Sequence, residues 1–213
     1  MAGFWDLIVH LDVHLALLLQ QYGTGVYLIL FLIVFCETGL VITPFLPGDS
    51  LLFVSGALWA AAGMDVSFLA ATLIVAALLG DNSNYFIGRQ LGSRVFRWES
   101  SRLLNRAALE RTQGFYDRHG GKTVVLARFI PLVRTFAPFV AGIGRMPYLR
   151  FLAFSVGGAL LWVLSLTWAG YYFGNIPWVR QNLSLVIFGI VGLSLLPVLH
   201  AFVKAHWGSI RGS

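Results

Sequence analysis

The sequence predicts an all-α integral membrane protein that folds as a single polytopic domain over residues 1–213. Two observations lead to this fold class. Hydrophobic residues make up 58% of the chain and charged residues only 11%, which is far from the usage of soluble proteins. Apolar stretches near the roughly 20 residues that a membrane-spanning helix needs also recur along the chain, and prolines interrupt two of them.

The first element is expected to be an interfacial amphipathic helix over residues 4–20, because Asp6, His10 and His14 share one helical face in an apolar segment. A proton-binding or metal-binding role for the two histidines is the alternative, although an interfacial polar face explains them without it. The following segments are predicted to be a re-entrant hairpin (24–62), a transmembrane helix (66–88), a basic cytoplasmic segment (89–122), a second re-entrant hairpin (123–143) and two transmembrane helices (148–173 and 183–203).

The two hairpins follow from residues that a straight spanning helix cannot accommodate. Proline removes a backbone N–H and its ring collides with the preceding turn, so paired prolines divide an apolar stretch into two arms. Non-helical backbone at membrane depth survives only inside the protein or beside a water-filled cavity. The residues expected to break the two stretches are Pro44, Pro47, Gly48, Pro131 and Pro138.

A weak internal repeat indicates how these units are arranged. Residues 77–92 align without gaps with residues 159–174, six of the sixteen positions are identical, and both copies end in a G-x-x-x-G close-packing pattern. A Val-x-Gly sequence follows each hairpin break, at 54–56 and at 140–142. A hairpin plus one span crosses the membrane once, so two consecutive units have opposite orientations, which is the inverted repeat of many transporters.

The distribution of positive charge predicts the orientation in the membrane. The first basic residue is Arg89, and eight lysines and arginines fall between Arg89 and Lys122, whereas the part before Arg89 carries only acidic charges. This asymmetry is typical of the positive-inside rule and places the basic segment and the C-terminus in the cytoplasm. The net charge of +6 therefore indicates contact with anionic lipid, and we expect no nucleic-acid partner.

Two acidic residues beside the first break are candidates for proton binding. Glu37 and Asp49 stand six residues either side of position 43, so the two arms of a hairpin hold them at similar depth. A charge at the centre of a bilayer costs about 2.5–3.5 kcal/mol on insertion scales, so such residues pair, face water or handle a charged substrate. Two carboxylates held close together also favour the binding of a proton.

Two arginines beside the second break are candidates for binding an anionic headgroup. Arg128 and Arg134 stand three residues either side of Pro131, and the break lets both reach one pocket, to which Thr135 adds a hydroxyl. The planar guanidinium suits phosphate or carboxylate. The alternative is that the arginines and acids form static salt bridges that lock the hairpins together. Asp81 and Asn84 are candidate accessory residues, although Asp81 can also simply be hydrated or pair with Arg89.

Three long motifs resemble those of the bacterial DedA family, which is related to the eukaryotic VTT-domain proteins. They are FCETGLVITPFLPGDSLLF at 35–53, GDNSNYFIGR at 80–89 and HGGKTVVLARFIPLVRTFAPFVAG at 119–142. The resemblance implies a multi-pass protein of the bacterial inner membrane that supports envelope integrity. It also implies a link to the proton motive force and, as in some members, translocation of undecaprenyl phosphate. Related VTT proteins scramble phospholipids. The family's important acids fall on Glu37 and Asp49, and its essential arginines on Arg128 and Arg134.

The function predicted from these features is a proton-coupled transporter or flippase for a lipid with an anionic headgroup. The alternative is a proton-coupled exporter of small cations or cationic drugs, in which the acids bind the substrate. We expect neither an enzyme nor a cofactor or metal, because no nucleophile, histidine cluster or metal-ligand pattern accompanies the arginines. A homo-oligomer is left open. The tryptophans Trp162, Trp168, Trp178 and Trp207 are interpreted as interface or packing aromatics.

Overall fold

The computed structural model describes residues 11–40, 48–95, 131–174 and 176–182, together with residues 185, 186, 189 and 192. Within this part of the chain every regular element is helical. Several predicted features lie outside the described residues: Pro44, Pro47, Arg128, most of the basic segment, the first arm of the second hairpin and most of the span 183–203.

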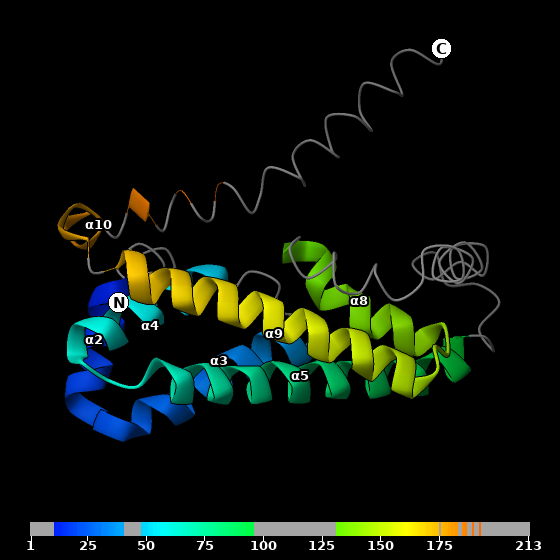
Figure 1. The fold of residues 1–213 in the computed structure, drawn as a ribbon. Coiled ribbons are helices and arrows are strands. Elements are labelled where there is room, and N and C mark those ends of the chain that lie inside the picture. The colour runs from blue at the N-terminus through cyan, green and yellow to red at the C-terminus, as the bar shows by residue number, and fades with distance from the viewer. Residues whose placement is uncertain are drawn as a thin grey trace, which may run out of the picture.

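Figure 1 shows the order and arrangement of the helices. They are α2 (Leu11–Tyr22), the short 3₁₀ turn η1 (Gly23–Gly25), α3 (Val26–Gly39), α4 (Gly48–Ala62), α5 (Val66–Val95), α8 (Pro131–Ile143), α9 (Tyr148–Phe173) and α10 (Pro177–Gln181). Three stretches of the described residues are long and apolar enough to cross a membrane, namely Val13–Gly39, Val66–Leu91 and Tyr148–Phe173. The described residues are thus all-helical in their regular structure, and the length and composition of the helices are those of a membrane protein.

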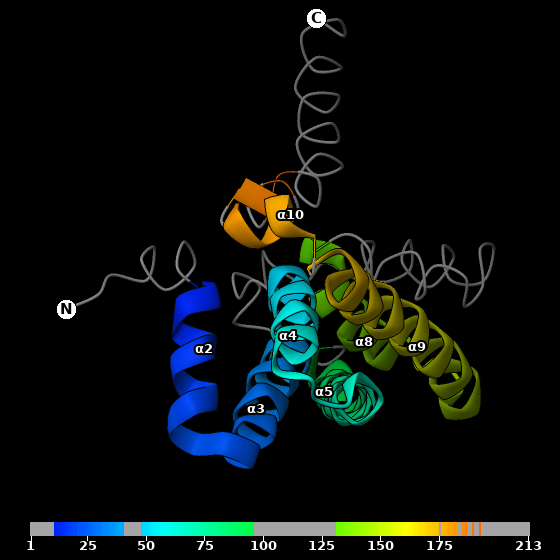
Figure 2. The ribbon, with the colours of Figure 1, turned by 60° about the vertical axis from the view of Figure 1, so that its left-hand side comes forward.

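The two long helices α5 and α9 lie side by side and run in opposite directions (Figure 1). The shorter helices pack on them: α3 and α8 lie against α5, and α4 lies against α9. Figure 2 views α5 almost end-on and shows these helices around it. Both α4 and α8 begin near the middle of the long helices, and from there α4 runs toward one end of the molecule and α8 toward the other (Figure 1).

An apolar core holds α3, α4, α5 and α9 together. Its largest members are Trp59 of α4 and Trp162 of α9, both of which are fully buried. Because an indole N–H buried among apolar side chains needs an acceptor, Trp59 Nε1 donates a hydrogen bond of 2.8 Å to the hydroxyl of Tyr27 on α3. Tyr27 in turn packs edge-on against Phe68 of α5, with 4.9 Å between ring centroids. This contact chain joins the hairpin arms to the long helix.

Glycines bring two pairs of helices into close contact. Where α4 crosses α9, a Cβ added to Gly56 would collide with the carbonyl oxygen of Thr167, and one added to Gly170 would collide with that of Phe53. Where α5 crosses α8, Gly142 faces the carbonyl of Tyr85 in the same way, and Gly88 faces the carbonyl of Phe139. Small residues allow such close approach of helix backbones in membrane proteins.

The observed boundaries differ from the predictions at the ends of α2 and α5. Helix α2 ends at Tyr22, two residues beyond the interfacial helix predicted for 4–20, and it buries Leu15 in the core while Val13 and Leu17 remain exposed. Helix α5 continues past residue 88 as far as Val95, because the first basic residues favour a helix as much as the apolar ones do.

The prediction that Pro138 breaks the second hairpin is wrong. Pro138 lies inside α8, which runs without interruption from Pro131 to Ile143. Pro138 removes one backbone hydrogen bond, the one to the carbonyl of Arg134 four residues before it. The close packing of α8 against α5 at Gly142 and Gly88 stabilises the helix against this loss. Pro131 is the first described residue of α8, and the residues before it lie outside the described part of the chain.

Candidate functional site

Arg134 is the centre of the candidate site. It lies in the first turn of α8 and bridges two carboxylates from different helices. Its Nη1 donates to Asp49 Oδ1 at 2.6 Å, and its Nη2 donates to Glu37 Oε1. Glu37 lies in the last turn of α3 and Asp49 in the first turn of α4. The structure therefore brings together three of the four predicted charges; Arg128 lies outside the described residues.

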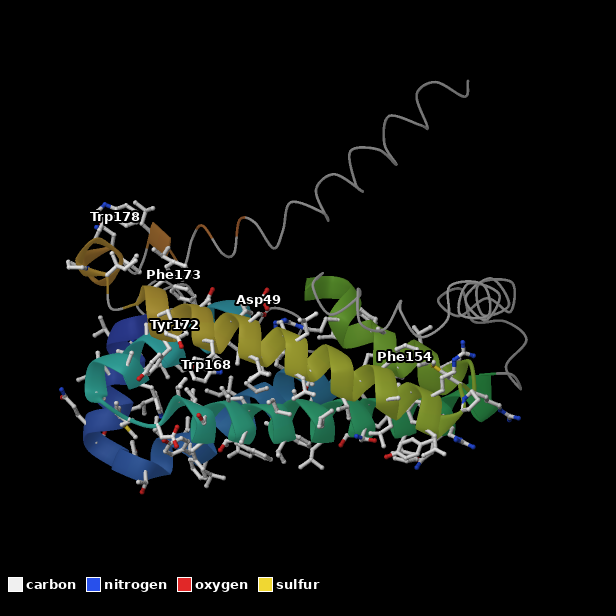
Figure 3. All side chains as sticks on the ribbon, viewed as in Figure 1. Asp49, Phe154, Trp168, Tyr172, Phe173 and Trp178 are labelled. Carbon is white, nitrogen blue, oxygen red and sulfur yellow. The ribbon has the colours of Figure 1, made fainter. Side chains whose placement is uncertain are left out.

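All three charged groups are removed from solvent to different degrees. The side chains of Glu37 and Arg134 are 1% and 4% exposed, and that of Asp49 is 16% exposed. Figure 3 places Asp49 near the middle of α9, at the level where α4 and α8 begin. Because a guanidinium cannot give up its proton at physiological pH, burying Arg134 in an apolar bundle requires the nearby carboxylates.

Gly48 makes room for the Glu37 carboxylate. A Cβ at position 48 would collide with both carboxylate oxygens of Glu37, so any other residue there would push the acid away. Gly48 is also the first residue of α4, whose N-terminal amides carry a partial positive charge that favours an anion. Gly48 was predicted as a break residue, and the structure shows that its missing side chain leaves space for the carboxylate of Glu37.

Trp162 packs in the apolar core, as one of the two sequence interpretations predicts, and it also contacts the charged residues of the site. Its Nε1 donates a hydrogen bond of 2.8 Å to Asp49 Oδ1. The guanidinium carbon of Arg134 lies 4.5 Å from the centre of the Trp162 ring, within the range of a cation–π interaction. One signal for this role was present in the sequence: Trp162 falls in the middle of its span, where an indole N–H needs an internal partner, whereas belt tryptophans lie near the ends.

Asn84 lies on the long helix α5 and connects the end of α3, which carries Glu37, to the start of α8, which carries Arg134. Its amide nitrogen donates to the carbonyl of Thr38 at 3.1 Å and to the carbonyl of Thr135 at 2.7 Å. Thr38 follows Glu37 in the chain and Thr135 follows Arg134, so one side chain fixes the position of both partners of the buried ion pair. Asn84 was predicted as an accessory residue, and the geometry makes it a positioning residue. The contact of Thr135 with Asn84 is made by its backbone carbonyl, and the predicted role of its hydroxyl in headgroup binding stays a prediction.

Asp81 lies in a separate polar contact between α5 and α9. It is 1% exposed, and Ser155 Oγ donates a hydrogen bond of 2.5 Å to its Oδ2. Arg89, the partner considered from the sequence, donates instead to the hydroxyl of Tyr85 at 3.2 Å. Asp81 is one turn before Asn84 on α5 and therefore lies on the same side of that helix.

The Arg134 cluster contains polar atoms with unused hydrogen-bonding capacity. Among the described residues, Glu37 Oε2, Asn84 Oδ1 and Arg134 Nε are buried without a hydrogen-bond partner. Each such atom costs about 1–3 kcal/mol, so a cluster of them marks a site with spare donors and acceptors. No group of three metal-ligating side chains comes together within the described segments.

The chain matches one family model and several membrane proteins of bacteria over most of its length. The family model described as the VTT domain matches residues 46–172. The chain is 57% identical over 210 residues to Protein DedA of Escherichia coli K12, covering 98% of this chain and 96% of that protein. It is 37% identical over 202 residues to Inner membrane protein YghB of the same organism, covering 93% and 90%. An uncharacterized membrane protein of Mycobacterium leprae is 44% identical over 169 residues, covering 79% and 76%. No solved structure matches.

Proposed function

Since the chain belongs to the DedA family of VTT-domain membrane proteins, we propose that it moves a lipid with an anionic headgroup across the bacterial inner membrane in exchange for protons. Undecaprenyl phosphate and phospholipids are the candidate substrates. The observation that carries this proposal is the buried guanidinium of Arg134, held between Glu37 and Asp49 from two separate helices. A guanidinium can bind a phosphate with two N–H groups at once. In a transporter the ion pairs of Arg134 with the two acids must open so that the substrate can bind and leave.

Competition for Arg134 provides the coupling. In the described part of the site, two carboxylates share one guanidinium. Protonating either acid weakens its ion pair with Arg134, and the freed N–H groups can then donate to a phosphate oxygen. Arg128, at the same proline break, supplies the second positive charge in this scheme, which leaves the complete cluster neutral when all four groups are ionised.

Alternating access rests on re-entrant hairpins arranged as an inverted repeat. The glycine contacts support this arrangement, because Gly56 and Gly142 are equivalent positions of the sequence repeat, as are Gly88 and Gly170. Each crossing therefore joins the hairpin arm of one unit to the long helix of the other. The opposite directions of α4 and α8 from a shared starting level agree with the inversion (Figure 1). Such paired interrupted helices form the substrate site in transporters of this kind.

The orientation proposed for the chain follows the positive-inside rule, with the basic segment and the C-terminus in the cytoplasm. Green fluorescent protein fused to the C-terminus is expected to fluoresce, and alkaline phosphatase fused there is expected to be inactive. Active phosphatase would reverse the proposed topology without affecting the assignment of the site.

An exporter of small cations is the second candidate, because two carboxylates converge and Glu37 Oε2 is buried without a partner. In that case the acids bind the substrate and Arg134 only balances their charge. The two functions differ in what they require of Arg134. A lysine keeps the charge but loses the bidentate geometry, so it impairs a phosphate site far more than a balancing charge.

Reconstituted vesicles provide the decisive test. Purified protein is to be incorporated with fluorescently labelled undecaprenyl phosphate or phosphatidylglycerol, with and without a pH gradient. We expect translocation that the gradient accelerates and that Arg134→Lys reduces by about tenfold, as for loss of one strong charged contact. The control is Arg150→Lys, an exposed arginine at the start of α9. Translocation by Arg134→Lys at the wild-type rate would contradict the lipid function.

A further inference from the structure

Two hydrogen-bond donors converge on one carboxylate oxygen in the candidate site. Asp49 Oδ1 accepts from Arg134 Nη1 at 2.6 Å and from Trp162 Nε1 at 2.8 Å. The Trp162 ring lies 4.5 Å from the guanidinium carbon, so the same side chain also supports the plane of Arg134. A guanidinium and an indole N–H aimed at one point are arranged to bind an anionic oxygen.

The acid that fills this position is the accessible member of the cluster. The Asp49 side chain is 16% exposed, whereas Glu37 and Trp162 are each 1% exposed and Arg134 is 4% exposed. The two donors therefore lie in the core, and their acceptor is the most exposed of the four side chains. Among these four side chains, Asp49 is the one that an entering ligand can displace.

We propose that the Asp49 carboxylate occupies the position of a phosphate oxygen of the substrate, and that Trp162 is a further residue that binds the anionic group. This inference rests on the proposed function and deepens it. When Asp49 leaves, Arg134 Nη1 and Trp162 Nε1 lose a shared acceptor, and two buried donors without a partner are costly. A phosphate oxygen at the same point restores both hydrogen bonds. Asp49 thus acts as an internal competitor of the ligand.

Binding to the full-length protein in detergent tests this role of Trp162. The probe is dihexanoyl phosphatidic acid, titrated by calorimetry, with dihexanoylglycerol as the phosphate-free control. Trp162→Phe keeps an aromatic ring beneath Arg134 but removes the N–H, and we expect it to weaken binding by about tenfold. Trp168→Phe is the matched control, because Trp168 lies on the same helix and packs with Tyr171 and Tyr172. It is expected to bind as the wild type does.

Asp49→Asn provides a measurement in the opposite direction. Removing the charge of the competitor is expected to tighten binding by severalfold, an outcome that a merely destabilised protein would not give. If Trp162→Phe does not fold, this variant alone decides: tighter binding supports the proposal, and unchanged or weaker binding overturns it. Inorganic phosphate is titrated in parallel. Binding as tight as that of phosphatidic acid would assign the site to free phosphate instead of a lipid headgroup.

Arg134→Gln separates failure of this inference from failure of the proposed function. If Arg134→Gln loses binding while Trp162→Phe binds normally, Trp162 is not a ligand-binding residue and the proposed function stands. If Arg134→Gln also binds phosphatidic acid with wild-type affinity, the anion does not bind at this cluster, and both proposals fall.

Discussion

Helices α4 and α8 are alike in packing and opposite in charge. Each begins at the level of the candidate site and crosses a long helix at a glycine that touches backbone, Gly56 for α4 and Gly142 for α8. In its first turn, however, α4 carries Asp49 and α8 carries Arg134. The N-terminal end of a helix favours a negative charge and disfavours a positive one.

This difference means that the two helices depend on the ion pair unequally. Asp49 lies at a helix terminus that suits it, and a carboxylate can also bind a proton when its partner is lost. Arg134 lies at a terminus that does not suit it and keeps its charge in any circumstances. Arg134 therefore needs the two acids in order to stay buried, whereas the acids can stay buried without Arg134 by binding protons. The arrangement suits a site in which the acids change state and the arginine stays fixed.

Removing both acids is expected to have the largest effect. The double variant Glu37→Gln/Asp49→Asn leaves the guanidinium of Arg134 buried without a counter-charge, and we expect a loss of about 3–5 kcal/mol of stability. Arg134→Met is expected to lose less, because the carboxylates that remain can take up protons. Thermal unfolding in detergent measures both. As a control, Asp65→Ala removes an exposed acid that caps α5 through Ser67 N–H and should cost about 1 kcal/mol. Equal losses in the two site variants would refute the asymmetry.

The shared packing of α4 and α8 predicts the next largest effect. Gly56→Ala and Gly142→Ala each place a methyl group against a backbone carbonyl of the facing long helix. We expect both to destabilise by about 1–3 kcal/mol, because two helix backbones must move apart. Gly157→Ala in α9 is the matched control: an added Cβ there has nothing within 4 Å, so the change is neutral or stabilising. A clear loss at only one of the two crossings would show that the helices are not packed equivalently.

The sequence was sufficient to predict the residues with a strong local signal. A charge inside an apolar stretch is visible without a structure, so Glu37, Asp49 and Arg134 were all identified, and their proximity is observed. Pro131 as the break of the second hairpin stays a prediction, because the residues before it lie outside the described part of the chain. The roles of these residues in binding protons and headgroups stay predictions.

The features that were missed depend on partners far away in the chain. The position of Trp162 in the middle of its span predicts an internal partner, but the partner itself, Asp49, lies 113 residues earlier and is identified only by the structure. Whether Pro138 breaks a helix or lies within one depends on packing with a distant segment, here the contact of α8 with α5 at Gly142 and Gly88. Local propensity does not contain such contacts.

Asn84 offers the smallest and most specific test, because it holds both charged segments through its two amide hydrogens. Asn84→Asp replaces these donors by acceptors that face two carbonyls, and we expect a loss of about 1–2 kcal/mol together with slower lipid translocation. Asn82→Asp is the matched control on the same helix, since an aspartate keeps the acceptor for the hydroxyl of Tyr148 and loses only a donor to the Leu78 carbonyl within α5, which does not involve α3 or α8. Thermal unfolding and vesicle assays on both variants separate the two positions. If Asn84→Asp matched Asn82→Asp in both measurements, α5 would not be what holds the ends of α3 and α8 in register.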